Sequence, residues 1–414
     1  MDALTSLMGM VALLAIAVIF SKNRQAINKR TVLGAFAIQF IIGAFVLFIP
    51  IGKDLLEVVS SGVSSVLGFS HAGIEFLFGG LVSDKMFELF GGGGFIFAIR
   101  VLPVIVFFSA LVSVLYYLGI MQLFIRILGG ALQKLLGTSK NESMSATANI
   151  FVGQTEAPLV IAPYINRLSR SELFAVMCGG LASIAGTVLG GFAAMGVDMQ
   201  YLIAASFMAA PGGLLFAKIL VPETEERSSE TVEEDVSIEK PANVIDAAAA
   251  GASSGLMLAL NVGAMLLAFI GLIALVNGML GGVGSYIGLP ELSLEYLLGY
   301  LFYPVAVIIG IPFDEAMVSA SFIGQKLVLN EFVAYVNFTE YLAVTELSTR
   351  STAIITFALC GFANFAAAAM LLGGLGTMAP KRRHEISTLC MSAIFAATMS
   401  NLMSATIAGF FFSF

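Results

Sequence analysis

The sequence predicts an all-α membrane protein with eight transmembrane helices and two re-entrant helical hairpins. Of its 414 residues, 58% are hydrophobic and 11% are charged, against roughly 45–50% and 25% in a soluble domain. Apolar segments of about 20 residues recur along the chain, and this length is sufficient to cross a bilayer. The 43 glycines and 11 prolines also permit broken helices, which occur at membrane depth where they line a cavity.

The first span is predicted over residues 4–20. An acid rather than a basic region precedes it, so we interpret it as a span and not as a removed signal peptide. Seven further spans are predicted over 32–50, 95–120, 173–195, 201–220, 244–280, 352–375 and 386–412. Two other regions, 143–168 and 312–341, are apolar but carry polar residues in mid-segment, and we interpret them as the re-entrant hairpins.

Basic residues gather in loops that share one side of the membrane if all eight spans cross and both hairpins re-enter: Lys22, Arg24, Lys29, Arg30, Arg126, Lys134, Lys140, Arg167, Arg170, Lys381, Arg382 and Arg383. Short cytoplasmic loops are rich in Lys and Arg, so we expect this side to face the cytoplasm and both termini to lie outside the cell inner membrane.

The stretch 222–240 holds eight acids and two bases, which supply −6 of the net charge of −7. We interpret it as an acidic cytoplasmic linker. The rest of the chain is nearly neutral and offers no basic stripe to a nucleic acid, so a nucleic-acid partner is not expected.

A hairpin followed by two spans occurs twice, over about 141–220 and again over about 312–412. The first hairpin enters from the basic side and the second from the acidic side, so the repeats have inverted topology. Such repeats are typical of secondary transporters, whose substrate and ion sites lie near the midplane where discontinuous helices meet.

The first hairpin contains the sequence NIFVGQTEAP over 149–158. Pro158 suits the first turn of a helix and Gly153 frees the backbone before it, so one helix should end near Val152 and another should begin near Ala157. The tip then presents an amide, a hydroxyl and a carboxylate: Gln154, Thr155 and Glu156. The alternative is that these groups only cap the second helix.

In the second hairpin, Glu331 is the only acid between Lys326 and Glu340. A salt bridge with Lys326 is one interpretation. The other is that Glu331 and Glu156, from hairpins that enter from opposite sides, meet at the midplane and accept hydrogen bonds from a polar, uncharged ligand.

The span after each hairpin carries a matching disruption, at 182–188 and at 361–364. Unwinding there would free carbonyl oxygens for a hard cation. The small residues could instead serve close helix packing.

Three motifs in order, GQTEAP at 153–158, NEF at 330–332 and GFANF at 361–365, resemble the concentrative nucleoside transporter family in its bacterial-length branch. The similarity extends along essentially the whole chain and includes FGGGGF at 90–95 and AAPGG at 209–213. Each motif alone is weak, but the three in this order are highly specific.

The resemblance implies sodium-coupled secondary active import of nucleosides of the uridine, cytidine and adenosine class by an elevator-like form of alternating access. It implies a homotrimer in the lipid bilayer, Na⁺ as the coupling ion, no organic cofactor and no enzymatic activity. It also implies scaffold spans in 1–120 and 244–285, a transport domain built from the hairpin repeats 121–220 and 286–414, and the acidic linker over 221–243.

The resemblance further implies individual roles. The nucleobase would be contacted by the hairpin tip that begins at Gly153, through Gln154, Thr155 and Glu156, together with Val188. The ribose hydroxyls would be held by Glu331 and Asn364, with Phe362 beside the ligand. The sodium site would consist of side chains of Asn149 and Ser183 and carbonyl groups of Val152 and Ile184.

This chain departs from the family at Ala366 and Ala367, where two serines are usual and the second adds a ribose contact. Losing one hydroxyl from a polar site costs about 0.5–1.5 kcal/mol, so a change in affinity or sugar preference is expected at Ala367. Other functions stay open: a proton-coupled symporter using Glu156 or Glu331, a passive channel, and an intramembrane enzyme. The chain lacks an evident nucleophile with its base.

Overall fold

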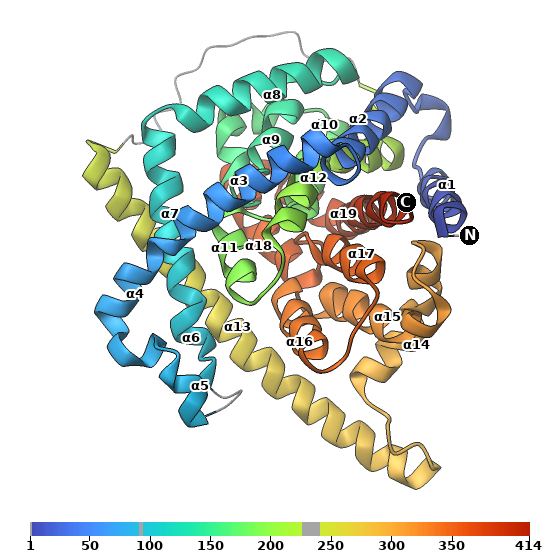
Figure 1. Cartoon of the computed structure of the whole chain (residues 1–414). Helices are drawn as coiled ribbons and strands as arrows, with labels where there is room; N and C mark the ends of the chain where they lie inside the picture. The colour runs from blue at the N-terminus through green and yellow to red at the C-terminus, as the bar shows by residue number, and fades with distance from the viewer. Residues whose placement is uncertain (1, 91–93, 226–240) are drawn as a thin grey trace.

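The structure is a computed structural model that describes residues 2–90, 94–225 and 241–414 (Figure 1). Within these ranges all regular secondary structure is helical, as the sequence predicts. Eight helical stretches in the described part are long and apolar enough to cross a membrane. Seven of them coincide with predicted spans, whereas the predicted span 352–375 consists of two shorter helices. Most of the predicted acidic linker lies outside the described residues.

The N-terminal part contains α1 (Asp2–Ile19), α2 (Lys29–Leu47), α3 (Pro50–Gly68), α4 (Ser70–Phe78), α5 (Lys85–Phe90), α6 (Phe97–Arg100) and α7 (Leu102–Tyr117). Helices α3–α5 occupy a region to which the sequence analysis assigned no element. Together, as Pro50–Phe90, they form the additional apolar stretch. Charged residues such as Asp54 and Glu57 are spaced through it, which hides it from a search for unbroken apolar segments.

The first repeat follows α8 (Ile120–Leu136) and contains α9 (Lys140–Ala148), the 3-10 helix η4 (Ala157–Arg167), α10 (Arg170–Ala182), α11 (Gly186–Ala194) and α12 (Met199–Leu220). Ser139 and Ser169 begin α9 and α10 and form capping boxes with the acids three residues later. The α-helix ends at Ala148 rather than near Val152, but turns continue, and Val152 N donates to Ala148 O at 3.0 Å.

Helix α13 (Val244–Ile287) has 44 residues and packs along α7 (Figure 1). Small residues permit this contact: a Cβ added at Gly251 would lie 2.5 Å from Ser113 Cβ, and one at Gly255 would lie 2.6 Å from Ser109 Cβ. Ser113 Oγ also donates to Ala247 O at 2.7 Å. The two helices therefore form a closely packed pair.

The second repeat follows α14 (Leu294–Ile308) and contains α15 (Phe313–Val328), α16 (Glu331–Val344), α17 (Thr349–Leu359), α18 (Phe365–Met378) and α19 (Arg383–Phe411). The axes of α14 and α15 are bent by 117°. Helices α15 and α16 are joined by Leu329 and Asn330 and pack against each other, so the predicted second hairpin is a helix-turn-helix. Re-entry into the membrane stays a prediction for both hairpins.

Helices α12 and α19 form the centre of the core, with α10, α17, α1 and α2 packed around them. Gln39 of α2 is fully buried, and its Nε2 donates to Ser404 Oγ at 2.9 Å. Arg350 at the start of α17 donates to Gly409 O at 3.0 Å and to Ser6 Oγ at 2.9 Å. The start of α1 therefore lies beside the end of α19, and both termini lie at the same end of the molecule (Figure 1).

Candidate functional site

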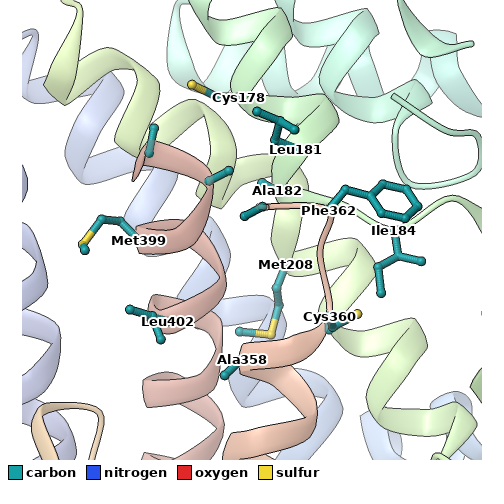
Figure 2. Packing of buried hydrophobic residues seen from close by; sticks show 14 of the residues in the cluster. Cys178, Leu181, Ala182, Ile184, Met208, Ala358, Cys360, Phe362, Met399 and Leu402 are labelled. Atoms are coloured by element: carbon teal, nitrogen blue, oxygen red, sulfur yellow. The ribbon is translucent and has the colours of Figure 1, made fainter. Parts of the chain in front are cut away.

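Two helix breaks lie side by side in the core: 183–185 between α10 and α11, and 360–364 between α17 and α18 (Figure 2). Every residue of both breaks is buried. Phe362 N in the second break donates to Ser183 O in the first at 3.2 Å. The two breaks, which begin at residues 183 and 360, were predicted separately from the sequence. The structure brings them into direct contact.

Asn401 of α19 bridges the two breaks. Its Nδ2 donates to Ala182 O at 2.6 Å and to Cys360 O at 2.9 Å, while its Oδ1 accepts from Lys326 Nζ at 2.6 Å. Gly361 allows this approach, because an added Cβ would lie 2.4 Å from Asn401 Oδ1. Asn401 was not predicted as a site residue, because its only signal in the sequence is an amide within an apolar span.

The second hairpin meets the second break through Glu331 and Asn364, which are both buried. Asn364 Nδ2 donates to Glu331 Oε2 at 2.7 Å, and Asn364 Oδ1 accepts from Ala367 N at 2.8 Å to cap α18. The ion pairs of the described residues do not include the possible salt bridge between Glu331 and Lys326. Phe362 is 8% exposed and packs in the hydrophobic core.

The first hairpin tip is partly closed on itself. Glu156 Oε2 accepts from Gly153 N at 3.3 Å, but the Glu156 side chain makes no capping hydrogen bond to η4, so the structure does not show the capping interpretation. Gln154 is buried against α10, where a Cβ added at Gly180 would lie 3.0 Å from Gln154 Cβ, and its Oε1 has no hydrogen-bond partner among the described residues. Thr155 is exposed and lies beside α18. Capping therefore does not account for the buried amide.

The first tip also contacts the start of α11. Gly186 N donates to Phe151 O at 3.1 Å, and Val188, two residues further on, is buried. The hydrogen bonds of Glu156 and Glu331 go to different partners, so the meeting of these two carboxylates at the midplane stays a prediction.

The four residues expected to bind sodium gather where α9 meets the break after α10. Asn149 Nδ2 donates to Ser145 O at 2.9 Å, which leaves Asn149 Oδ1 buried and without a hydrogen-bond partner among the described residues. Ser183 Oγ donates to Gly179 O at 3.0 Å, and a Cβ added at Gly179 would lie 3.3 Å from Asn149 Nδ2. The other two members are also buried: Val152 and Ile184. Neutral oxygen ligands of this kind fit a hard cation, and the unpaired amide oxygen is available to one.

Three family models match consecutive parts of the chain. They describe the N-terminus of a Na⁺ dependent nucleoside transporter over 8–81, nucleoside recognition over 98–199, and the C-terminus of a Na⁺ dependent nucleoside transporter over 201–409. Among curated proteins, the nucleoside permease NupC of Helicobacter pylori is 54% identical over 99% of this chain and 98% of its own. The sodium/nucleoside cotransporter 1 of Mus musculus is 37% identical over 99% of this chain and 64% of its own.

Solved structures agree with these matches. CNTnw in an inward-facing, substrate-bound state is 59% identical, with a TM-score of 0.96 over 100% of this chain and 98% of that chain. A variant of CNTnw in an outward-facing state has a TM-score of 0.98 over 100% of this chain and 99% of that chain. With its motifs, its paired helix breaks and these similarities taken together, the chain belongs to the concentrative, Na⁺ dependent nucleoside transporter family.

Proposed function

We propose that this transporter, which imports nucleosides by alternating access, binds its coupling sodium ion at Asn149 and Ser183. The observation that carries the proposal is the buried, unpaired Asn149 Oδ1 next to the break that begins at Ser183. Burying a polar atom without a partner costs about 1–3 kcal/mol, and a bound cation would remove this cost. The carbonyl oxygens of Val152 and Ile184 would complete an oxygen-only site.

The same segment that binds the ion also carries the substrate tip, which supplies a mechanism for coupling. Asn149 and Val152 lie within five residues of Gln154 in the same segment. Phe151, which lies between Asn149 and Val152, accepts a hydrogen bond from Gly186 N through its carbonyl oxygen. An ion that fixes this segment would also fix the position of Gln154. Nucleoside binding should therefore be weak without sodium and strong with it.

On the substrate side, Glu331 and Asn364 are proposed to hold the ribose, because a buried carboxylate accepts hydrogen bonds from hydroxyl groups and an amide can both donate and accept. The first tip and α11 would face the nucleobase through Gln154, Thr155, Glu156 and Val188. Phe362 and Ala367 would border the sugar. A neutral nucleoside fits such a site, since it brings no charge that must be neutralised.

Coupling to one sodium ion would supply the energy for accumulation. Moving one charge across the membrane potential contributes about 2.3 kcal/mol per 100 mV. At about 1.4 kcal/mol per decade, this voltage alone supports a concentration ratio approaching two decades. The sodium gradient would add to it.

Uptake by the purified protein in liposomes tests the proposal. Labelled uridine or adenosine should accumulate when an inward sodium gradient is imposed and should stop accumulating when choline replaces sodium. Unchanged nucleoside, recovered and identified by chromatography, would separate transport from catalysis. Uptake that is indifferent to the sodium gradient would refute sodium coupling.

Proton coupling is the second candidate, because Glu156 has one backbone donor at 3.3 Å and no described ion-pair partner. A protonated Glu156 could then replace the ion as the group that closes the first tip. Uptake driven by a pH gradient in sodium-free buffer would favour this candidate, whereas the neutral oxygen set around Asn149 favours sodium.

We further propose a homotrimer in the cell inner membrane, with both termini outside and with 1–120 and 244–285 supplying the scaffold. The neighbouring positions of the two termini support a common side for them. Along α13, apolar side chains such as Leu267 and Leu275 are at least 60% exposed, which suits lipid or subunit contact. Native mass spectrometry would test the trimer, and labelling of terminal cysteines in intact cells would test the orientation.

A further inference from the structure

Lys326 lies in the last turns of α15 and is only 2% exposed, yet the ion pairs of the described residues do not include it. Its Nζ donates instead to Ala358 O at 3.0 Å and to Asn401 Oδ1 at 2.6 Å. Ala358 is in the last turn of α17, where helix carbonyls lack intrahelical partners and carry partial negative charge. The ammonium therefore sits at the carbonyl end of the first half of a broken helix.

The first repeat resembles the second, except that a neutral side chain takes the place of the lysine. Helix α10 also ends at a break, and the hairpin before it supplies a polar side chain, Asn149, next to its last turns. That side chain is neutral and has an unpaired oxygen, whereas the corresponding hairpin of the second repeat supplies a cation, Lys326. The carbonyl end of α17 already has its positive charge, and the carbonyl end of α10 does not.

Asn401 connects the two ends. It accepts from Lys326 and donates to Ala182 O, the last residue of α10, and to Cys360 O, the first residue after α17. The four residues of this hydrogen-bond network are each at most 2% exposed: Lys326, Asn401, Ala182 and Cys360. The position of the ammonium is therefore transmitted to both breaks through one amide.

We propose that the Lys326 ammonium is a permanent, covalently attached cation that holds the break after α17 as the sodium ion holds the break after α10. The second repeat then needs no ion of its own, and each transport cycle takes one sodium ion rather than two. Lys326 and Asn401 are positioning residues, since they act on the nucleoside through the breaks. This inference rests on the sodium coupling proposed above.

Lys326→Gln is the direct test, because it keeps donors for Ala358 O and Asn401 but removes the charge. Influx of ²²Na⁺ and tritiated uridine is measured together in proteoliposomes, and uridine binding is titrated with sodium. The wild-type protein should show one sodium per nucleoside and a Hill coefficient near one. The variant should bind uridine at least about 10-fold more weakly at saturating sodium, or should show a steeper sodium dependence with a ratio rising toward two.

Two further variants separate the role of the charge from a general effect on folding. Lys326→Arg keeps the charge and should keep the single-sodium dependence. Lys218→Gln alters another buried lysine, which pairs with Glu142 at 2.5 Å and donates to Ser171 Oγ in the first turn of α10, at the opposite end of that helix from the break, and it should leave the Hill coefficient near one. If Lys326→Gln does not fold, the inference is tested by the sodium-to-nucleoside ratio of the wild type and by the Hill coefficient of Lys326→Arg.

A wild-type ratio of two would overturn the inference, as would a Lys326→Gln protein that matches the wild type in affinity and slope, or a Lys326→Arg protein with a doubled slope. Failure of the proposed function looks different. If wild-type uptake ignores sodium, both the coupling and the role of Lys326 fail. If wild-type uptake needs sodium and Lys326→Gln behaves identically, only the role of Lys326 fails.

Discussion

Asn364 Nδ2 donates a hydrogen bond of 2.7 Å to Glu331 Oε2, which joins the N-terminal end of α18 to the N-terminal end of α16. The other carboxylate oxygen, Glu331 Oε1, is the atom that we expect to accept a hydrogen bond from a ligand hydroxyl. The second hairpin and the second break thus form one rigid half of the proposed substrate site.

Glu331→Ala should abolish detectable nucleoside binding, because each hydrogen bond to a charged group contributes about 1.5–3 kcal/mol. Two such bonds correspond to a loss of about 100-fold or more in affinity. Glu331→Gln keeps the shape and should retain weak binding. Calorimetric titration with uridine measures both, and the melting temperature of each variant shows whether it is folded; wild-type affinity in a folded Glu331→Ala protein would move the site elsewhere.

Gln154→Ala should also abolish nucleoside binding without unfolding the protein. The Gln154 amide is buried with its Oε1 unpaired, so its removal takes away a donor and an acceptor that the fold does not use. Binding of uridine and adenosine is measured in parallel, because a nucleobase contact should affect them unequally. Equal, unchanged affinities for the two ligands would assign Gln154 to the fold alone.

Ser183→Ala should raise the sodium concentration needed for half-maximal nucleoside binding, by about 3-fold to 10-fold, while affinity at saturating sodium changes little. Ser319→Ala is the matched control, since Ser319 is buried and its Oγ donates to Glu315 O at 2.7 Å with the same spacing as Ser183 to Gly179. A sodium titration followed by uridine binding distinguishes them. Identical shifts in both variants would contradict a sodium contact at Ser183.

Ala367→Ser should strengthen nucleoside binding by about 2-fold to 10-fold, the equivalent of one hydroxyl hydrogen bond. The position lies at the start of α18, where Ala367 N already bonds to Asn364, and it is 1% exposed. The gain should vanish with either the 2′-deoxy or the 3′-deoxy nucleoside, which identifies the hydroxyl contacted. Ala366→Ser is the control, and an equal gain there would show that the effect is not specific to Ala367.

The sequence predicted the helix class, the two hairpins and the two breaks because glycine, proline and polar residues interrupt apolar segments there. It could not predict the bridging role of Asn401, whose partner Ala182 is 219 residues away. Nor could it decide between partners for Lys326, because Glu331, only five residues later in the sequence, is the local alternative for a salt bridge. The hydrogen bond from Asn364 to Glu331 was not predicted either: the family resemblance implied only that both residues hold the ribose, and helix periodicity carries no information about contacts between separate helices.

The helices in the region 50–90 were not predicted from the sequence, for a different reason. The longest of them, α3, is amphipathic rather than continuously apolar, and charged residues such as Asp54 and Glu57 interrupt the pattern that identifies a span. At the other extreme, α13 was predicted to begin at residue 244, and it does, because Asn243 caps it by accepting from Ile245 N and Asp246 N. Local capping chemistry is readable from sequence, whereas the packing of an interrupted helix is not.

The most direct test of sodium-coupled nucleoside transport is the accumulation ratio of labelled uridine in proteoliposomes under an imposed inward sodium gradient, with the membrane potential clamped by potassium and valinomycin. One sodium ion per nucleoside predicts that uridine concentrates inside and that a tenfold sodium gradient, without voltage, raises the internal concentration about tenfold. A plateau at equal internal and external uridine, whatever the sodium gradient, would contradict it.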